Sequence, residues 1–304
     1  MMKRLMVAML AVAAMTSCSK ESTEEDIIPD TPVKVQFNAG VMDVQAKALV
    51  TGTTLPDGNM GVYAWDGGTT DFSKTTHENL NNAKIAVSTN GTKFDFEADH
   101  EAFWPVGTLD FYAYYPQVTG ADLIAATAST TPKVNIKLAD QIDYMWASPV
   151  KEAKKATPTV NFEFNHALSA ITIIVKKEAD AGTVNLSAIK IAKYHATSQM
   201  DIATGDLTAD ASEVEFPISI TAADLSEAGD EFVTDYLVWP GSAPEFTLTL
   251  NNIDKTVTPK DGENELIFTA NKKHTLTFTI TATGIQVTAS ATDWSAGNNG
   301  TGSI

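Results

Sequence analysis

The residues best suited to chemistry form an acidic cluster in the first half of the chain. Asp95, Glu97 and Asp99 alternate and would share one face of a strand, and His100 and Glu101 follow directly. Carboxylates on one face could hold Ca²⁺, because this cation prefers oxygen ligands. However, the spacing matches no calcium-loop motif, which needs a glycine and a distal glutamate. We therefore favour a solvated strand edge whose charge discourages aggregation.

Catalytic chemistry has little support elsewhere. The histidines are scattered without metal-ligand spacing, and neither G-x-S-x-G nor H-E-x-x-H occurs. The single cysteine is Cys18, so the body of the chain holds no cysteine nucleophile and no disulfide can form within the chain. We therefore predict that the protein is not an enzyme, and that it has no catalytic residues, no metal site and no cofactor.

Cys18 has the context of a lipidation site. A lysine–arginine pair precedes an apolar run over 5–15, which is shorter than the roughly 20 residues that span a bilayer and fits a secretory signal. The sequence MTSC at 15–18 resembles the lipobox of bacterial lipoproteins, with methionine where leucine is more usual. This resemblance implies a signal peptide over 1–17 and a lipoprotein that carries palmitate on Cys18. The alternative is an incidental free thiol.

Residues 18–32 form a predicted acidic tether. They are polar and marked by prolines, and they have no periodic apolar face, which is typical of disorder. The cluster Glu21, Glu24, Glu25 and Asp26 resembles the signal that sends Bacteroides-type lipoproteins across the outer membrane. The alternative is a solvated linker that carries no export signal. We predict a cell-surface lipoprotein of the outer membrane.

The net charge excludes one class of partner. The chain has 21 Lys and Arg residues against 38 Asp and Glu residues, a formal net charge of −17. Such a surface repels phosphate backbones, and no basic stripe appears, so we predict no nucleic-acid binding. Apolar residues make up 43% of the chain, enough for real cores, and the length favours two domains.

Alternation of apolar and polar residues runs through most of the chain. Val33, Val35, Phe37 and Ala39 alternate with polar side chains, which predicts a half-buried strand. Further strands are predicted at 60–65, 84–88, 92–97, 108–115, 133–138, 143–147, 159–164, 168–176, 183–193, 213–219, 234–239, 245–250, 265–270, 274–281 and 284–289. Only 120–128 and 222–228 could carry a helical turn or two. Many short strands without alternating helices favour antiparallel β-sandwiches.

The domain boundary is predicted in 148–158. This stretch, SPVKEAKKATP, is charged, rich in small residues and contains prolines near both ends. One sandwich would occupy 33–152 and the other 153–304.

Four groups of residues resemble the fimbrillin-like family of Bacteroides-type bacteria. They are FWPVG at 103–107 leading into LDFYAYYP at 109–116, DYMWA at 143–147, FEFNHALSAI at 162–171, and an ending with LTFTI at 276–280, GIQV at 284–287 and Asp293-Trp294. Physically these stretches indicate packing, and His166 is better explained as a hydrogen-bonded structural histidine than as a ligand. The resemblance implies a type V pilus subunit of two transthyretin-like β-sandwiches that reaches the surface as a lipoprotein.

The resemblance also implies assembly by strand exchange. In that family a protease removes the segment up to a basic residue together with the first strand, and a strand from another subunit fills the groove. About four apolar side chains at roughly 1.5–3 kcal/mol each would contribute about 6–12 kcal/mol. Ladder hydrogen bonds would set the register.

The parts implied for this exchange can be placed on the chain. The removable first strand would carry Val33, Val35, Phe37 and Ala39, cleavage would separate Lys47 from Ala48, and a candidate donor strand carries Ile285, Val287, Ala289 and Ala291. The alternative for the last segment, which we favour, is the final strand of its own sandwich, because alanine and threonine bury little area.

One departure from the family concerns arginine. No arginine follows the signal peptide, so an arginine-specific protease has nothing to cut, and Lys47 becomes the predicted site if processing occurs. Without processing, an anchor or accessory role would fit better. Expected partners are other pilus subunits, the outer membrane and a host or bacterial surface ligand. The alternative function is a cell-surface glycan-binding lipoprotein without polymerisation, with Trp65 and Trp146 facing solvent.

Overall fold

The computed structural model describes residues 31–41, 54–74, 77–261 and 263–294. Within these ranges the regular structure is almost entirely strand, which confirms the all-β prediction. Helical structure in the same ranges is limited to 3-10 turns of three residues each: η1 (Glu78–Leu80), η2 (Gly120–Asp122), η3 (Leu138–Asp140) and η4 (Ala179–Ala181).

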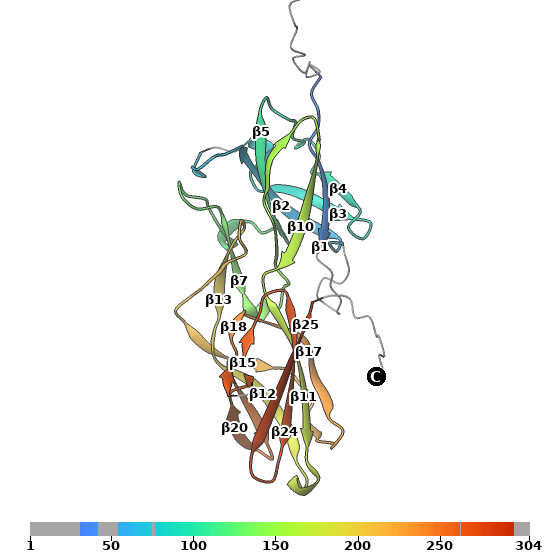
Figure 1. The fold of residues 1–304 in the computed structure, drawn as a ribbon, viewed down its shortest axis with the longest axis vertical. Helices are drawn as coiled ribbons and strands as arrows, with labels where there is room; N and C mark the ends of the chain where they lie inside the picture. The colour runs from blue at the N-terminus through green and yellow to red at the C-terminus, as the bar shows by residue number, and fades with distance from the viewer. Residues whose placement is uncertain (1–30, 42–53, 75–76, 262, 295–304) are drawn as a thin grey trace, which may run out of the picture. The chain divides into compact units, whose positions relative to one another are not determined.

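The first half of the chain forms an eight-stranded sheet (Figure 1). Its order is β1 (Gln36–Val41), β10 (Thr159–His166), β8 (Met145–Ala147), β5 (Thr108–Tyr115), β2 (Gly58–Asp66), β3 (Ala83–Ser88) and β4 (Lys93–Phe96), with β9 (Val150–Lys154) also paired to β5. The sheet curves until its two edges approach, since the rings of Phe37 on β1 and Phe96 on β4 lie 5.4 Å apart between centroids.

The centre of this sheet is β5, and both of its faces are buried. Phe111, Ala113 and Tyr115 line one face, while Asp110, Tyr112 and Tyr114 line the other, and all six side chains are shielded from solvent. A strand with buried side chains on both faces needs partners for its polar groups. The buried Asp110 is therefore expected to be hydrogen-bonded.

The second half of the chain packs two sheets face to face. One sheet has the order β17 (Asp230–Val238), β11 (Ser169–Lys177), β24 (Lys272–Ile280) and β25 (Ile285–Asp293). The other has the order β15 (Glu213–Ile218), β12 (Asn185–His195), β19 (Glu245–Leu250) and β20 (Ile253–Val257), with β16 (Ala223–Asp224) also paired to β12. Phe246 on β19 meets Phe278 on β24 with ring centroids 5.6 Å apart, as in a sandwich core.

Smaller sheets complete the strand pairing. A second four-stranded sheet has the order β14 (Leu207–Ala209), β13 (Thr197–Asp201), β7 (Lys133–Lys137) and β6 (Leu123–Ile124). Two short pairs join β18 (Gly241–Ser242) to β23 (Ile267–Phe268), and β21 (Lys260–Asp261) to β22 (Asn264–Glu265).

Most ladders are antiparallel, as predicted, but two are parallel. β1 runs parallel to β10, and β11 runs parallel to β24. Both pairs join strands that are far apart in sequence, and parallel neighbours need such long connections. The local alternation of apolar and polar residues does not show whether two strands pair in parallel or antiparallel.

One local prediction differs from the structure, and a second stretch contains a strand that was not predicted. The stretch 222–228 contains the short strand β16 and no helical turn. The expected boundary stretch, 148–158, contains β9, which pairs with β5. Because β10 also belongs to the eight-stranded sheet, the change of sheet falls between β10 and β11. The division into two domains stays a prediction.

Candidate functional site

β1 is an edge strand with a single ladder. It pairs in parallel with β10 from Gln36 opposite Thr159 to Val41 opposite Phe164 (Figure 1). Of the four side chains predicted to face inward, Val35 and Phe37 are buried, and Val33 and Ala39 are half-buried. The predicted inner face of the first strand is therefore present.

The side chain of Phe37 supplies most of the packing of β1. Its ring stacks on Phe162 of β10 at 5.8 Å and meets Phe111 of β5 edge-on at 6.0 Å. Phe96 of β4 lies on a further side at 5.4 Å. β1 forms no ladder with β4, and a cavity of about 320 Å³ lies between these two strands. Side-chain burial, rather than hydrogen bonding on both edges, thus holds β1.

The segment before β1 is held by the FWPVG stretch. The Val35 amide donates to the Ala102 carbonyl, and the Trp104 amide donates to the Val33 carbonyl, both at 2.9 Å. The Trp104 indole donates to the Pro158 carbonyl at 3.2 Å. This stretch therefore positions the start of the first strand, whereas the adjacent Phe103 side chain is 53% exposed.

β25 is the edge strand of the other sheet. It pairs antiparallel with β24 along its whole length, from Ile285 opposite Ile280 to Asp293 opposite Lys272. The residues predicted for a donor strand are weakly buried: Ile285, Val287 and Ala289 are half-buried, and Ala291 is exposed. In this structure the segment is the last strand of its own sheet, as the favoured alternative expects.

A buried aromatic anchor follows β25. The Trp294 side chain is 1% exposed and stacks on the imidazole of His166, with the ring centroids 4.2 Å apart and the planes 5° from parallel. His166 Nδ1 is hydrogen-bonded to Asp143 Oδ1 at 2.8 Å. This confirms His166 as a buried, hydrogen-bonded histidine. The contact between Trp294 and His166 links the end of β25 to β10.

The cluster of Asp143, His166 and Trp294 was missed by sequence reasoning. Each residue belongs to a different stretch that resembles the family, DYMWA, FEFNHALSAI and the Asp293-Trp294 ending. Nothing in their spacing shows that these stretches meet. The available signal was only that each stretch places a polar or aromatic residue beside an apolar run.

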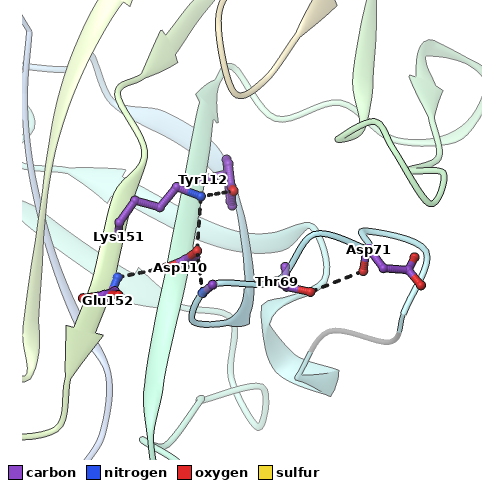
Figure 2. A network of polar contacts seen from close by, with 7 residues as sticks. Thr69, Asp71, Asp110, Tyr112, Lys151 and Glu152 are labelled. Carbon is purple, nitrogen blue, oxygen red and sulfur yellow. Dashed lines mark hydrogen bonds and ion pairs between the residues drawn. The ribbon is translucent and has the colours of Figure 1, made fainter.

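Asp110, on the central strand β5 of the first sheet, is the centre of a polar network (Figure 2). Its carboxylate accepts the Gly68 amide at 3.2 Å and the Glu152 amide at 2.8 Å, and it pairs with Lys151 Nζ at 3.2 Å. Lys151 also donates to the Tyr112 hydroxyl and lies 4.3 Å from the centroid of that ring. The network joins β5 to β9 and to the turn after β2.

The charges in this network favour a fixed ion pair. Burial opposes the charge of Lys151, but its hydrogen bonds and charge interactions with Tyr112 and Asp110 outweigh burial and raise the pKa of Lys151. A protonated lysine beside a carboxylate that accepts two backbone amides provides neither a base nor a nucleophile. We assign the network to the stability of the sheet.

The tryptophans predicted to face solvent do not do so. Trp65 is 3% exposed, stacks on Tyr63 at 5.5 Å and meets Phe72 and Tyr112 edge-on. Trp146 is half-buried. The prediction of an exposed pair is wrong, because the turn after β2 and its following loop cover Trp65. The glycan-binding alternative therefore loses the support of solvent-facing tryptophans.

The acidic cluster is engaged in surface ion pairs. Lys93 Nζ lies 2.5 Å from Asp95, and Lys84 Nζ lies 3.5 Å from Glu97. Across the residues that the structure describes, no three His, Cys, Asp or Glu side chains are placed to hold a metal ion. None of the helices in the described ranges has the length and apolar character needed to cross a membrane.

Three predicted site residues lie outside the described residues: Cys18, Lys47 and Ala48. By chain position, Lys47 and Ala48 fall between the end of β1 at Val41 and the start of β2 at Gly58. Lipidation and processing stay predictions.

Comparison with known proteins identifies related sequences and folds. A model of the fimbrillin-like family matches residues 47–294. The chain is 24% identical over 312 residues to a candidate fimbrium subunit, Fim1C, of Bacteroides uniformis, covering 97% of this chain and 96% of that protein. The crystal structure of a candidate cell adhesion protein from Bacteroides uniformis matches with a TM-score of 0.61 at 21% identity, covering 88% and 99% of the two chains. That of a fimbrial protein from Bacteroides vulgatus matches with a TM-score of 0.58 at 14% identity, covering 87% and 100%.

Proposed function

The chain belongs to the fimbrillin-like family, and from that premise we propose that it is a structural and adhesive fimbrial subunit assembled by strand exchange. It travels to the cell surface as an outer-membrane lipoprotein acylated at Cys18. Cleavage after Lys47 then removes β1. Its partners are other pilus subunits, and a strand from one of them fills the groove that β1 leaves.

The observation that carries this proposal is the position of β1. It comes before all other strands of the eight-stranded sheet, and β10 is its one strand partner there. A cut between Lys47 and Ala48 would leave no covalent link between β1 and β2. Release then breaks a single ladder of six residue pairs and the side-chain contacts of Val35, Phe37 and Val41. It also breaks the two backbone hydrogen bonds that tie the segment before β1 to Ala102 and Trp104.

The groove beneath β1 would attract a replacement strand. Loss of β1 uncovers the ring of Phe162 and the edges of Phe111 and Phe96, which contact Phe37 in the intact chain. Exposed apolar area of this kind drives association. A strand that places about four apolar side chains there gains roughly 6–12 kcal/mol. The free edge of β10 would supply the ladder hydrogen bonds.

β25 is the candidate donor in this chain. Donation would require it to leave β24 and to withdraw Trp294 from His166. Its side chains offer little resistance to this step, since none of Ile285, Val287, Ala289 and Ala291 is fully buried. Release therefore depends on the ladder and the Trp294 anchor.

The first test is the mature N-terminus, measured by mass spectrometry on surface-shaved and membrane fractions. We expect the surface protein to begin at Ala48 without lipid. Lys47→Gln should keep the acylated Cys18 and form no detergent-resistant ladder of oligomers. The matched control, Lys74→Gln, alters another lysine and should behave as wild type. A wild-type surface protein that starts at acylated Cys18 would refute cleavage and favour an anchor or accessory subunit.

The second test locks β25 in place. Thr277 and Thr288 face each other in the ladder between β24 and β25, so the double change Thr277→Cys and Thr288→Cys can form a disulfide within the chain. If β25 is the donor, the oxidised variant loses the oligomer ladder and regains it on reduction. Oligomers that persist in the oxidised form would exclude β25 and leave another strand as donor.

A further inference from the structure

A second cavity lies in the other half of the chain, away from both edge strands discussed above. It has a volume of about 390 Å³, at the small end of the roughly 300–1,000 Å³ of ligand pockets. Its walls come from the end of β12, from β13 and β14, and from the segment 239–244 that includes β18. The apolar part of the lining includes Tyr194, Leu207, Trp239 and Pro244.

Two polar atoms of this lining are buried without a partner among the described residues. They are the Ser198 hydroxyl and His195 Nδ1. The Ser198 residue is 3% exposed, so its hydroxyl is also cut off from bulk solvent. His195 Nδ1 lies 4.0 Å from Asp210 Oδ1, which is too long for a hydrogen bond. Leaving such groups unpaired is unfavourable, because each has lost its hydrogen bonds to water and gained none in the protein.

The aromatic walls are held rigidly. The Tyr194 hydroxyl donates to the Trp239 carbonyl at 2.9 Å, and the Trp239 indole donates to the His195 carbonyl at 2.8 Å. Burial raises the pKa of Tyr194, so this hydroxyl stays a neutral donor. Both aromatic side chains have their polar groups satisfied, and each is only 6% exposed, so they form a fixed wall that offers a small apolar surface. A rigid wall reduces the ordering cost of binding.

The charges around the cavity disfavour an anion. The Thr197 hydroxyl and its neighbours lower the pKa of Asp210, which therefore remains a carboxylate close to His195. Lys193 at the rim lies 4.0 Å from Glu245, so its charge is partly offset. A purely apolar ligand would leave Ser198 and His195 unpaired. The ligand that satisfies both limits is neutral, carries hydroxyl groups and presents apolar C–H surface.

We propose that this cavity binds a neutral sugar unit, with Ser198 and His195 pairing its hydroxyl groups and the half-buried Leu207 contacting its C–H surface beside the wall of Tyr194 and Trp239. This inference rests on the adhesive role proposed above, and it names neutral sugars as the class of ligand that the subunit would bind. Sugar binding here does not depend on β1 or β25, so the two proposals can fail separately.

The test is a titration of the isotopically labelled full-length protein with neutral methyl glycosides of glucose, galactose, mannose, fucose and N-acetylglucosamine, followed by NMR. The amides of His195 and Ser198 and the indole of Trp239 report on the cavity. We expect at least one glycoside to shift them saturably within tens of millimolar, the range of a contact worth a few kcal/mol. Ser198→Ala should weaken that binding by about tenfold, since one hydrogen bond is lost.

Ser187→Ala is the matched control, because Ser187 lies on β12 outside the cavity lining and its hydroxyl already donates to the Thr249 carbonyl. It should leave glycoside binding unchanged. Ser198→Ala should not lower the melting temperature, because it removes an unpaired hydroxyl, so weaker binding cannot be attributed to unfolding. The proposal is overturned if no glycoside gives saturable shifts, if Ser198→Ala binds as tightly as wild type, or if glucuronate binds better than every neutral sugar.

Discussion

The two edge strands β1 and β25 are held in opposite ways. β1 is six residues long, runs parallel to one neighbour and buries Phe37 and Val41, with Phe37 packed among three aromatic rings. β25 is nine residues long, runs antiparallel to one neighbour and has no fully buried side chain of its own. Its stability comes from the ladder and from Trp294 just beyond it.

This difference defines what each strand can exchange. The groove beneath β1 is shaped for an aromatic side chain at the position of Phe37, whereas β25 offers only isoleucine, valine and alanine at its inner positions. A core that receives smaller side chains keeps a cavity, which costs stability. β25 is therefore an imperfect substitute for β1. A donor strand with a larger central residue, from a different subunit, would fill this groove better.

The largest expected effect is at the centre of β1. Phe37→Ala should lower the free energy of unfolding by about 3–5 kcal/mol, because a buried ring with three aromatic neighbours is lost. The matched change in β25, Val287→Ala, removes a half-buried side chain and should cost roughly 1 kcal/mol or less. Urea denaturation of the unprocessed chain compares the two variants. Equal losses would mean that β1 does not depend on its side chains as we argue.

The next effect should be confined to β25. Trp294→Ala removes a fully buried indole that stacks on His166 and should cost roughly 3 kcal/mol. Because the remaining contacts of β25 are weak, its amides should exchange with solvent faster, while those of β11 in the same sheet stay protected. Hydrogen exchange followed by mass spectrometry separates these peptides. Uniform loss of protection across the sheet would show that Trp294 stabilises the whole sheet and not the strand end.

A polar position inside the first sheet gives a reference away from both edges. Asp110→Asn keeps the size of the side chain but replaces an anionic acceptor of two backbone amides and the partner of Lys151. We expect a loss of about 2 kcal/mol in urea denaturation, typical of hydrogen bonds to charged groups. Lys151→Met, which leaves both backbone amides bonded to Asp110, should cost less. If the two variants cost the same, the ion pair rather than the amide contacts would be the main contribution.

Much of the fold follows from residue alternation, and the exceptions have physical causes. The predicted strands 108–115 and 245–250 coincide with β5 and β19, whose apolar residues are dense and buried. β9 and β20 were missed because their side chains are mostly exposed, so no alternation marks them. The inner positions Val35 and Phe37 were predictable for the same reason as β5.

The contacts of the candidate site were less predictable. The stacking of Trp294 on His166 joins the residue after β25 to the last residue of β10, which belongs to a different sheet. The unpaired atoms of Ser198 and His195 depend on the path of the segment 239–244. Neither leaves a local pattern, because tertiary packing alone decides which side chains meet. The buried state of Trp65 has the same origin.

The smallest effect concerns acid and the strand on which β25 docks. His274 on β24 lies opposite Ala291 of β25, and burial, aided by the charge of Lys272, lowers the pKa of His274. Its Nε2 accepts the Thr269 amide at 3.1 Å and must be unprotonated to do so. As pH falls below about 6.5 the unfolded chain binds this proton first, so stability decreases until the folded pKa is reached, and it is constant above that window. His274→Gln should flatten this part of the stability–pH curve measured by urea denaturation, whereas His100→Gln, at an exposed histidine, should leave it in place. If the stability–pH curve keeps its slope in His274→Gln, another group causes the acid sensitivity, and that sensitivity is unrelated to the docking of β25.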